Sequence, residues 1–344
     1  MSPAKKLLPL AFVAALGLAA CSSGEPSADP AAETSSEPSS LSGTLTVYTS
    51  EPQAKIDEII AGFNEINPDV NVEVFRAGTG ELKTRIATEQ ENGEVQADVL
   101  LAADVPTFEA YKEADALAKL DVEFPDSIAE TYIDPEGYWV GTRVIPTVIA
   151  YNTNAQPNPP KSWEELADSE YAGQIAMPNP DVSGAAAFNA AVWLDDAQLG
   201  EEWLTKLMSN KPVILESNGP VGQAVAEGTN GIGVVVDYVA RELAQQGSPI
   251  DLVYPSDGAP YVSQPVGVFA DSDVQDLANA FIDYLISEEG QKTAVAQSYL
   301  PVRSDVGVPE GAPNMNDLKL LNPDLSVIAE KQADAVATFN SLVQ

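Results

Sequence analysis

Residues 139–152 read WVGTRVIPTVIAYN, an almost uninterrupted apolar run with one proline, Pro146, inside it. Proline has no amide hydrogen for a strand ladder, so this run suits a strand that crosses between sheets better than a regular central strand. The segment from Tyr261 to Ala270 is again extended and could be the return crossing. The two segments predict two lobes that are joined by at least two crossings.

The chain before the first crossing alternates strands and helices. Thr44–Ser50 is β-rich and alternating, and Lys55–Ile66 repeats apolar residues on one helical face. Val70–Arg76 and Gly80–Glu91 repeat the same order of strand and helix. This alternation predicts an α/β lobe with a largely parallel sheet.

A second strand–helix series lies between the crossings, with a capping box at Ser162 and a buried strand at Gly231–Val236. We therefore predict a first lobe from residues 44–145 plus 268–344 and a second lobe from residues 146–267. Ligands of such sheets bind where loops converge at the carboxyl ends of the strands. The expected fold is α/β and two-lobed, with a ligand cleft between the lobes and hinge closure.

The composition excludes several functions. The 344 residues carry a net charge of −35, which argues against nucleic acid as a partner because its phosphates require Lys and Arg. The chain has no His and one Cys. It therefore offers neither a Ser–His nor a Cys–His pair for catalysis, nor a zinc site built on His or Cys.

The N-terminus indicates an exported protein. Lys5 and Lys6 precede an apolar stretch, Leu7–Leu18, which is too short to span a membrane comfortably. The sequence that ends at Cys21 resembles the bacterial lipobox, in which the Cys is diacylated. We expect a signal peptide at residues 1–20 and a lipidated Cys21; the alternative is an ordinary signal peptide that contains a Cys.

Residues 21–43 are expected to form a flexible tether, because Ser, Ala, Glu and Pro dominate them and cannot bury enough surface to offset ordering. A tether of this length reaches on the order of 25 Å.

The chain resembles a family of bacterial extracellular solute-binding proteins that serve ferric-ion, thiamine, hexose-phosphate and aminoethylphosphonate importers. The order and spacing of several motifs carry this resemblance: LTVYTS (45–50), RAGTGEL (76–82), PNPDVSGA (178–185), GIGVVVDY (231–238), FIDYLISEEGQ (281–291) and YLPVR (299–303). The resemblance implies the two-lobed periplasmic-binding-protein-like fold, in a hinged, monomeric receptor without catalysis or cofactor. It would be held at the outer face of the cell membrane and deliver its ligand to an ABC permease with ATPase subunits.

Two turns in the first lobe offer anion-binding groups. Thr49, Ser50 and Glu51 end the first strand, where hydroxyls and free amides can bind an anion at a helix N-terminus. Ser50 could equally be a helix cap. Gly78-Thr79-Gly80 follows the second strand, and its glycines permit close backbone approach, although a plain tight turn would also explain them.

The second lobe offers the strongest candidate. Ser183-Gly184-Ala185 opens a helix whose dipole favours negative charge, although simple capping is the alternative. The resemblance implies that this tripeptide holds an oxyanion, and that Asn218 with Gly219 matches another anion-contacting stretch.

Asp237 and Tyr238 end a buried strand, at a place where the ferric members carry two adjacent tyrosines. This chain has only one tyrosine at that place, Tyr238, and this difference from the ferric members weakens a ferric assignment. A set of Tyr238, Asp237 and Glu51 could still offer oxygen ligands to iron, or Asp237 could cap the following helix. The cationic candidates are Arg143, near the cleft on the crossing strand, and also Arg76 and Arg303.

Two binding functions stay open. The first is capture of a small anionic solute, phosphorylated or a phosphonate, in which Asp237 or Glu51 pairs with an ammonium or accepts sugar hydroxyls. The second is a ferric-iron receptor. It is the alternative, because the sequence gives no primary expectation of a metal site. A secreted enzyme is disfavoured because the chain has no His and no Cys outside the lipobox.

Overall fold

The computed structural model describes residues 41–343. The predicted signal peptide, Cys21 and almost all of the tether lie outside these residues. The first strand starts at Gly43. Among the described residues, no helix combines the length and the apolar character needed to span a membrane.

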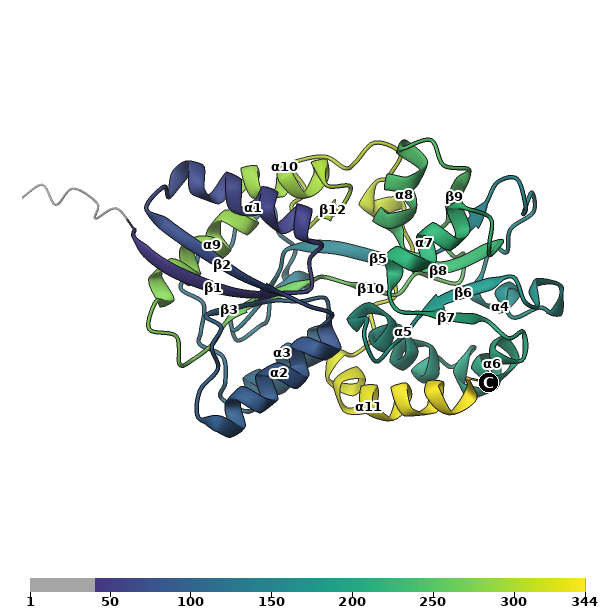
Figure 1. Ribbon diagram of the computed structural model, residues 1–344, viewed down its shortest axis with the longest axis horizontal. Coiled ribbons are helices and arrows are strands. Elements are labelled where there is room, and N and C mark those ends of the chain that lie inside the picture. Colours follow the sequence, from purple (N-terminus) through teal and green to yellow (C-terminus); the bar gives the residue numbers. More distant parts are fainter. Residues whose placement is uncertain (1–40, 344) are drawn as a thin grey trace, which may run out of the picture. The chain divides into compact units, whose positions relative to one another are not determined.

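Two separate sheets form the two lobes (Figure 1). The first sheet has the strand order β2-β1-β3-β11-β4, and the second has β10-β5-β8-β6-β7 with β9 and β12 also paired to β5. The strands are β1 (Gly43–Thr49), β2 (Val70–Arg76), β3 (Val99–Leu101), β4 (Val140–Gly141), β5 (Arg143–Asn152), β6 (Ile175–Pro178), β7 (Val213–Leu215), β8 (Ile232–Val236), β9 (Ile250–Val253), β10 (Tyr261–Val262), β11 (Pro265–Val268) and β12 (Leu300–Pro301).

Helices cover both sheets. They are α1 (Gln53–Ile66), α2 (Thr79–Asn92), α3 (Val105–Glu113), α4 (Trp163–Leu166), α5 (Gly184–Asp195), α6 (Gly200–Ser209), α7 (Asn218–Ala226), α8 (Asp237–Gln245), α9 (Gln275–Ile286), α10 (Glu288–Ala296) and α11 (Leu325–Leu342), with single 3₁₀ turns at Glu130–Tyr132, Ser169–Tyr171 and Met315–Asp317.

The strand residues of the first sheet alternate between two apolar layers. Leu45 and Val47 pack into the core that contains Phe63 of α1 and Phe281 of α9. Tyr48, the residue after Val47 and on the other face of the strand, packs into the core that includes Leu82 of α2. Burial on both faces is what a largely parallel sheet covered by helices requires.

The two crossings are where the sequence places them. β5 pairs with β12 at its start, Arg143 and Val144, and with β8 and β9 along its second half. On the return, β10 pairs with β5 whereas β11 pairs with β3 and β4. Each of these segments passes from one sheet to the other within a few residues. The two segments are therefore the connections about which the lobes can hinge.

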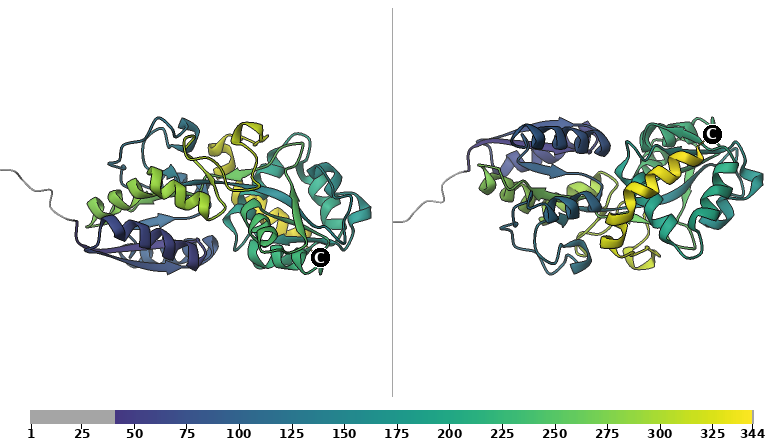
Figure 2. Two further views of the ribbon diagram at one scale, coloured as in Figure 1. Left: turned by 90° about the horizontal axis from the view of Figure 1, so that it is seen from above. Right: turned by 90° about the horizontal axis from the view of Figure 1, so that it is seen from below.

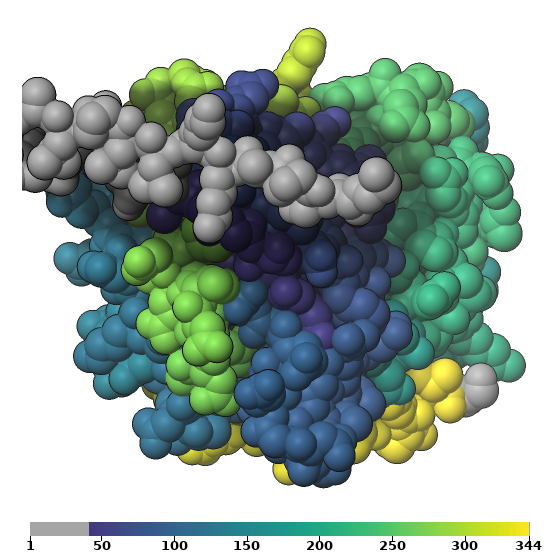
Figure 3. Space-filling view, turned by 60° about the vertical axis from the view of Figure 1, so that its left-hand side comes forward, coloured from purple at the N-terminus to yellow at the C-terminus, as the bar shows by residue number. Residues whose placement is uncertain are grey.

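The C-terminal helix α11 differs from the expectation that residues 268–344 belong to the first lobe. Its buried Ile328, Ala335 and Phe339 join the core of the second lobe, together with Trp163 and Trp193. Seen from below, α11 (yellow) lies obliquely across the junction of the lobes (Figure 2), and its surface runs along the lower edge in Figure 3. Gln332 also donates to Asp104 of the first lobe at 2.8 Å, so the helix is fastened to both lobes.

Candidate functional site

A cavity of about 680 Å³ lies between the lobes, lined by residues of both. Loops at the ends of β1, β2, β6 and β8 reach it, as do the N-terminal turns of several helices. Its polar lining consists of Ser50, Glu51, Lys55, Arg76, Thr79, Ser183, Ser217, Asn218, Gln223, Tyr238, Glu242, Gln246, Gln264 and Tyr299. This position matches the loop cluster that the strand order predicts for ligand binding.

The turn after β1 is fixed by its own side chains. Thr49 Oγ1 donates to the Leu101 carbonyl at 2.9 Å and accepts the amide of Glu51 at 3.0 Å. Thr49 is therefore fully buried behind the cavity wall, whereas Ser50 and Glu51 line the cavity. The threonine positions the turn from behind.

The N-terminus of α2 forms the adjoining edge. Gly78 and Thr79 line the cavity, whereas Gly80 lies against the second lobe. The Gly80 amide donates to the Val182 carbonyl at 3.4 Å, and a Cβ added to Gly80 would lie 1.9 Å from the Asp181 carbonyl oxygen. Glycine at this position lets the backbones of the two lobes meet.

The N-terminus of α5 presents a fixed hydroxyl to the cavity. Ser183 Oγ accepts the amide of Ala186 at 3.3 Å and Nδ2 of Asn218 at 3.1 Å. Asn218 is itself held because its Oδ1 accepts the Val236 amide at 3.2 Å. With two donors on its oxygen, Ser183 keeps its own hydrogen to offer to a ligand.

Backbone amides add to this hydroxyl. Gly184 and Ala185 line the cavity in the first turn of α5, where amide groups have no partner within the helix. The aligned peptide dipoles favour negative charge at this end. Ser183-Gly184-Ala185 therefore present a hydroxyl and two helix-end amides to the cavity, an arrangement suited to an oxyanion.

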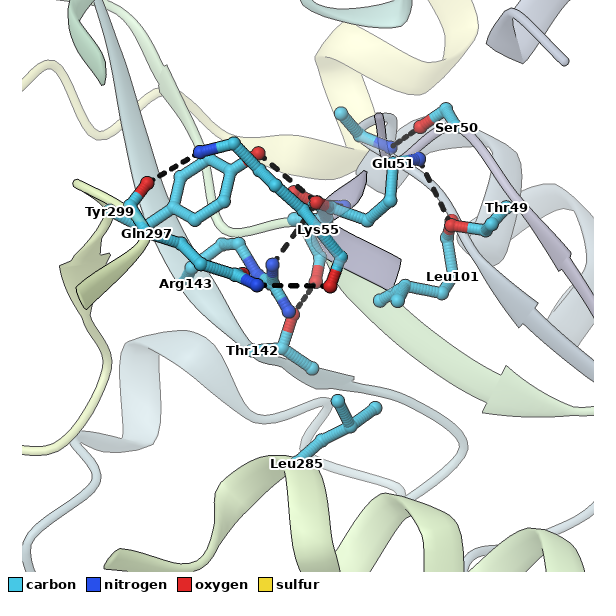
Figure 4. A network of polar contacts seen from close by, with 12 residues as sticks. Thr49, Ser50, Glu51, Lys55, Leu101, Thr142, Arg143, Leu285, Gln297 and Tyr299 are labelled. Carbon is cyan, nitrogen blue, oxygen red and sulfur yellow. Dashed lines mark hydrogen bonds and ion pairs between the residues drawn. The ribbon is translucent and has the colours of Figure 1, made fainter. Parts of the chain in front are cut away.

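The carboxylate of Glu51 is already occupied by protein groups. Arg143 Nη1 lies 3.1 Å from Oε1, and Tyr299 OH donates to Oε2 at 3.1 Å (Figure 4). Gln264 Nε2 also donates to Oε1. Glu51 and Arg143 are 1% and 2% exposed, and Arg143 does not line the cavity. Arg143 therefore neutralises the buried carboxylate, and neither group faces a ligand as a free charge.

Two tyrosines and a lysine form the wall beside Glu51. The ring centroids of Tyr238 and Tyr299 are 4.4 Å apart, and burial raises the pKa of both phenols, of Tyr299 well above its ordinary value. Lys55 Nζ lies 4.5 Å and 4.2 Å from the two centroids. It donates to the Gln297 carbonyl at 2.5 Å and pairs with Glu242 of α8. Burial lowers the pKa of Lys55, whereas the Glu242 carboxylate raises it.

Asp237 does not reach the cavity. It is fully buried and binds Arg241 Nη1 at 2.6 Å and Tyr254 OH at 2.9 Å. Burial raises the pKa of this carboxyl, against the opposing effect of the Arg241 charge. The set of Tyr238, Asp237 and Glu51 considered for iron is thus not gathered on one side of the cavity.

Within residues 41–343, no group of three or more Asp, Glu, His or Cys side chains is placed to hold a metal ion. Of the two remaining cationic candidates, Arg76 lines the cavity, whereas Arg303 pairs with Asp305 at 2.8 Å and does not line it.

Sequence reasoning missed several lining residues, above all Lys55, Glu242, Gln264 and Tyr299. Lys55 lies in the first turn of α1, directly after the turn that holds Glu51, and this nearness in sequence is the one local signal for it. Tyr299 belongs to one of the motifs that carry the family resemblance, but nothing local indicates that it faces the cavity.

Comparisons with known proteins identify the family and support the fold. Residues 95–325 match the family described as bacterial extracellular solute-binding protein. A relative, the Fe(3+)-binding periplasmic protein of Serratia marcescens, is 26% identical over 259 residues, which is 72% of this chain and 75% of that protein.

Two solved structures share the fold. Iron-bound HitA from Pseudomonas aeruginosa has a TM-score of 0.77 and 23% identity, covering 88% of this chain and 99% of that one. AfuA from Actinobacillus pleuropneumoniae, with fructose-6-phosphate bound, has a TM-score of 0.80 and 21% identity, covering 87% and 98%. With the family match over more than half of its length, this chain belongs to the bacterial extracellular solute-binding proteins.

Proposed function

We propose that the protein is the substrate-binding lipoprotein of an ABC importer. It would capture a small anionic solute, phosphorylated or a phosphonate, by closure of the lobes and deliver it to a permease with cytoplasmic ATPases. Family membership supports the transport role, and we assign no catalytic activity.

The observation that carries the anionic assignment is the N-terminus of α5. The Ser183 hydroxyl is oriented by Ala186 and Asn218 so that it can only donate to a ligand, beside two helix-end amides. The opposite wall supplies the ammonium of Lys55 and the guanidinium of Arg76. A surface rich in hydrogen-bond donors recognises an acceptor-only group such as a phosphoryl oxyanion.

The size and lining of the cavity suit an organic anion. A volume of about 680 Å³ lies within the range of small-molecule sites and exceeds the needs of inorganic phosphate. Apolar side chains of Ile145, Val236 and Val239 complete the lining. They offer a surface for the carbon skeleton that carries the phosphorus group.

A ferric-iron receptor is the second candidate, because Tyr238 and Tyr299 adjoin each other at the cavity. Phenolate oxygens are hard donors suited to Fe³⁺. The neighbouring Lys55 ammonium and the raised pKa of both phenols oppose this use, since binding would require their deprotonation next to a fixed positive charge.

For attachment, we propose that Cys21 becomes the diacylated N-terminus after removal of residues 1–20, and that residues 22–42 serve as tether. Two acyl chains suffice for stable anchoring. Labelling with radioactive palmitate should mark the wild type and not Cys21→Ser.

Thermal unfolding tests the solute. The purified protein is heated with inorganic phosphate, a hexose 6-phosphate, aminoethylphosphonate or ferric citrate. A ligand at about 100 times its dissociation constant should stabilise the folded state by about 2.7 kcal/mol. Stabilisation by a phosphorus compound supports the proposal, whereas stabilisation by ferric citrate alone favours the iron receptor.

A further inference from the structure

Lys55 occupies a position built for a cation. Its side chain runs from α1 along the Tyr299 ring to the backbone of Gln297 (Figure 4). The ammonium faces two aromatic rings, Tyr238 and Tyr299, at 4.5 Å and 4.2 Å from their centroids. The carboxylate of Glu242 and the carbonyl of Gln297 complete the surroundings. Ring faces, a carboxylate and a carbonyl each attract positive charge.

We propose that Lys55 is the specificity-determining residue of this cleft: its ammonium fills the cation position beside the rings of Tyr238 and Tyr299, so that the cleft accepts a metal-free anion. The part of this inference that concerns the anion rests on the proposed function. The part that concerns exclusion of a metal does not.

The charge balance at this wall supports the assignment. Arg143 neutralises Glu51, and Lys55 neutralises Glu242, so the charges pair one to one. A metal ion at the two rings would meet the Lys55 ammonium at close range, where like charges repel strongly in a site shielded from water. Lys55 is 8% exposed, so solvent screens it little.

The same ammonium joins the two lobes. Lys55 lies on α1 of the first lobe, and Glu242 lies on α8 of the second. The positive charge is therefore held in place by groups from both sides of the cavity. Without Lys55, Glu242 would stand unpaired at the cavity wall and would repel an anion.

The test uses Lys55→Gln, Lys55→Arg and a matched control, Lys206→Gln. Lys206 is an exposed lysine paired with Asp168 and does not line the cavity, so its substitution makes the same change in charge elsewhere. Calorimetric titrations use inorganic phosphate, a hexose 6-phosphate and aminoethylphosphonate. Separately, ferric nitrilotriacetate is titrated while visible absorption is recorded for a tyrosinate-to-iron band. Thermal unfolding checks that each variant is folded.

We expect Lys55→Gln to weaken binding of the phosphorus compounds about tenfold to 100-fold, because the change removes a positive charge and leaves Glu242 unpaired at the cavity wall. Lys55→Arg should keep affinity within about threefold and Lys206→Gln should not change it. Wild type should show no iron band, and Lys55→Gln should gain one. Unchanged affinity in folded Lys55→Gln, or an iron band in wild type, would overturn the assignment.

The two proposals fail in different ways. Wild type that binds no phosphorus compound contradicts the proposed function, and the iron titration then still decides the role of Lys55. A tyrosinate-to-iron band that appears only in Lys55→Gln supports the role of Lys55 in excluding a metal. The same band in wild type rejects that role.

Discussion

Arg143 and Glu51 form a buried ion pair beside the cavity, which Glu51 lines and Arg143 does not, with 3.1 Å between Nη1 and Oε1. Arg143 begins β5, the crossing strand, whereas Glu51 follows β1. Arg143 Nη1 has no partner in hydrogen-bond geometry, so charge attraction dominates the contact. The pair thus ties the crossing to the ligand-facing turn.

The first prediction concerns this pair. Arg143→Met should lower the free energy of unfolding by about 3–5 kcal/mol, because it leaves the Glu51 carboxylate buried without its counter-charge. Chemical denaturation measures the loss. The double variant Arg143→Met with Glu51→Gln should recover much of it. A single variant as stable as wild type would show that the pair contributes little.

Ser183 has a matched control in Ser287. Both serines cap a helix, since Ser183 accepts the Ala186 amide and Ser287 accepts the Gly290 amide, but only Ser183 lines the cavity. Each change to Ala should cost about 1 kcal/mol of stability. Only Ser183→Ala should weaken binding of the phosphorus ligand, by about tenfold. Equal affinities for the two variants would remove the hydroxyl from the site.

Gly80→Ala should impair closure rather than folding. The added Cβ would meet the Asp181 carbonyl of the other lobe at 1.9 Å, so the lobes could no longer approach at this edge. We expect weaker ligand binding with unchanged denaturation. Small-angle X-ray scattering should show that ligand compacts the wild type and not the variant. Compaction of both proteins would contradict this explanation.

The pH dependence of binding should follow Lys55. Because burial lowers its pKa, the ammonium loses its proton earlier than exposed lysines as pH rises, and anion affinity should fall with it. Arginine keeps its charge, so the Lys55→Arg profile should stay flat where wild type declines. Dissociation constants from about pH 7 to about pH 10 test this. Parallel profiles would exclude Lys55 as the titrating group.

The stability of the unliganded protein should change in the opposite sense. Between the lowered folded pKa of Lys55 and its higher unfolded value, the unfolded chain binds more protons, so this residue makes the free energy of unfolding rise with pH. Comparing the pH slope of denaturation for wild type and Lys55→Arg isolates that contribution.

The C-terminal helix should be a structural element. Phe339→Ala removes a side chain that is 2% exposed in the second-lobe core, and it should cost about 3–5 kcal/mol. Ser341→Ala, on the exposed face of the same helix, should cost almost nothing. Denaturation midpoints distinguish the two. A mild effect of Phe339→Ala would mean that α11 docks only weakly.

Much of the fold could be predicted because it depends on local pattern. The apolar run with Pro146 identifies the crossing strand, and regular apolar spacing identifies α1 and α9. The placement of α11 could not, because its partners in the second lobe are far away in sequence and apolar spacing does not say which core a helix joins.

The candidate site could likewise be predicted only where the signal in the sequence is local. The tripeptide 183–185 was predictable since a helix start with Ser and Gly is a local signal. Arg143 looked like a ligand group, but it pairs with Glu51, a partner that only the folded chain supplies. Asp237 pairs with Arg241 four residues further along α8, a local helical spacing that the sequence does show. Lys55 looked like an ordinary polar position of α1, because sequence alone does not bring Tyr238 and Tyr299 to it.

Binding of phosphorus oxyanions in the cleft is the central property that we propose for this protein. Calorimetry on the wild type should compare each phosphorus compound with its phosphorus-free counterpart, such as fructose 6-phosphate with fructose. The account predicts saturable binding of at least one phosphorus compound and none of its counterpart. Equal binding of the two members of a pair, or binding of ferric iron alone, would contradict it.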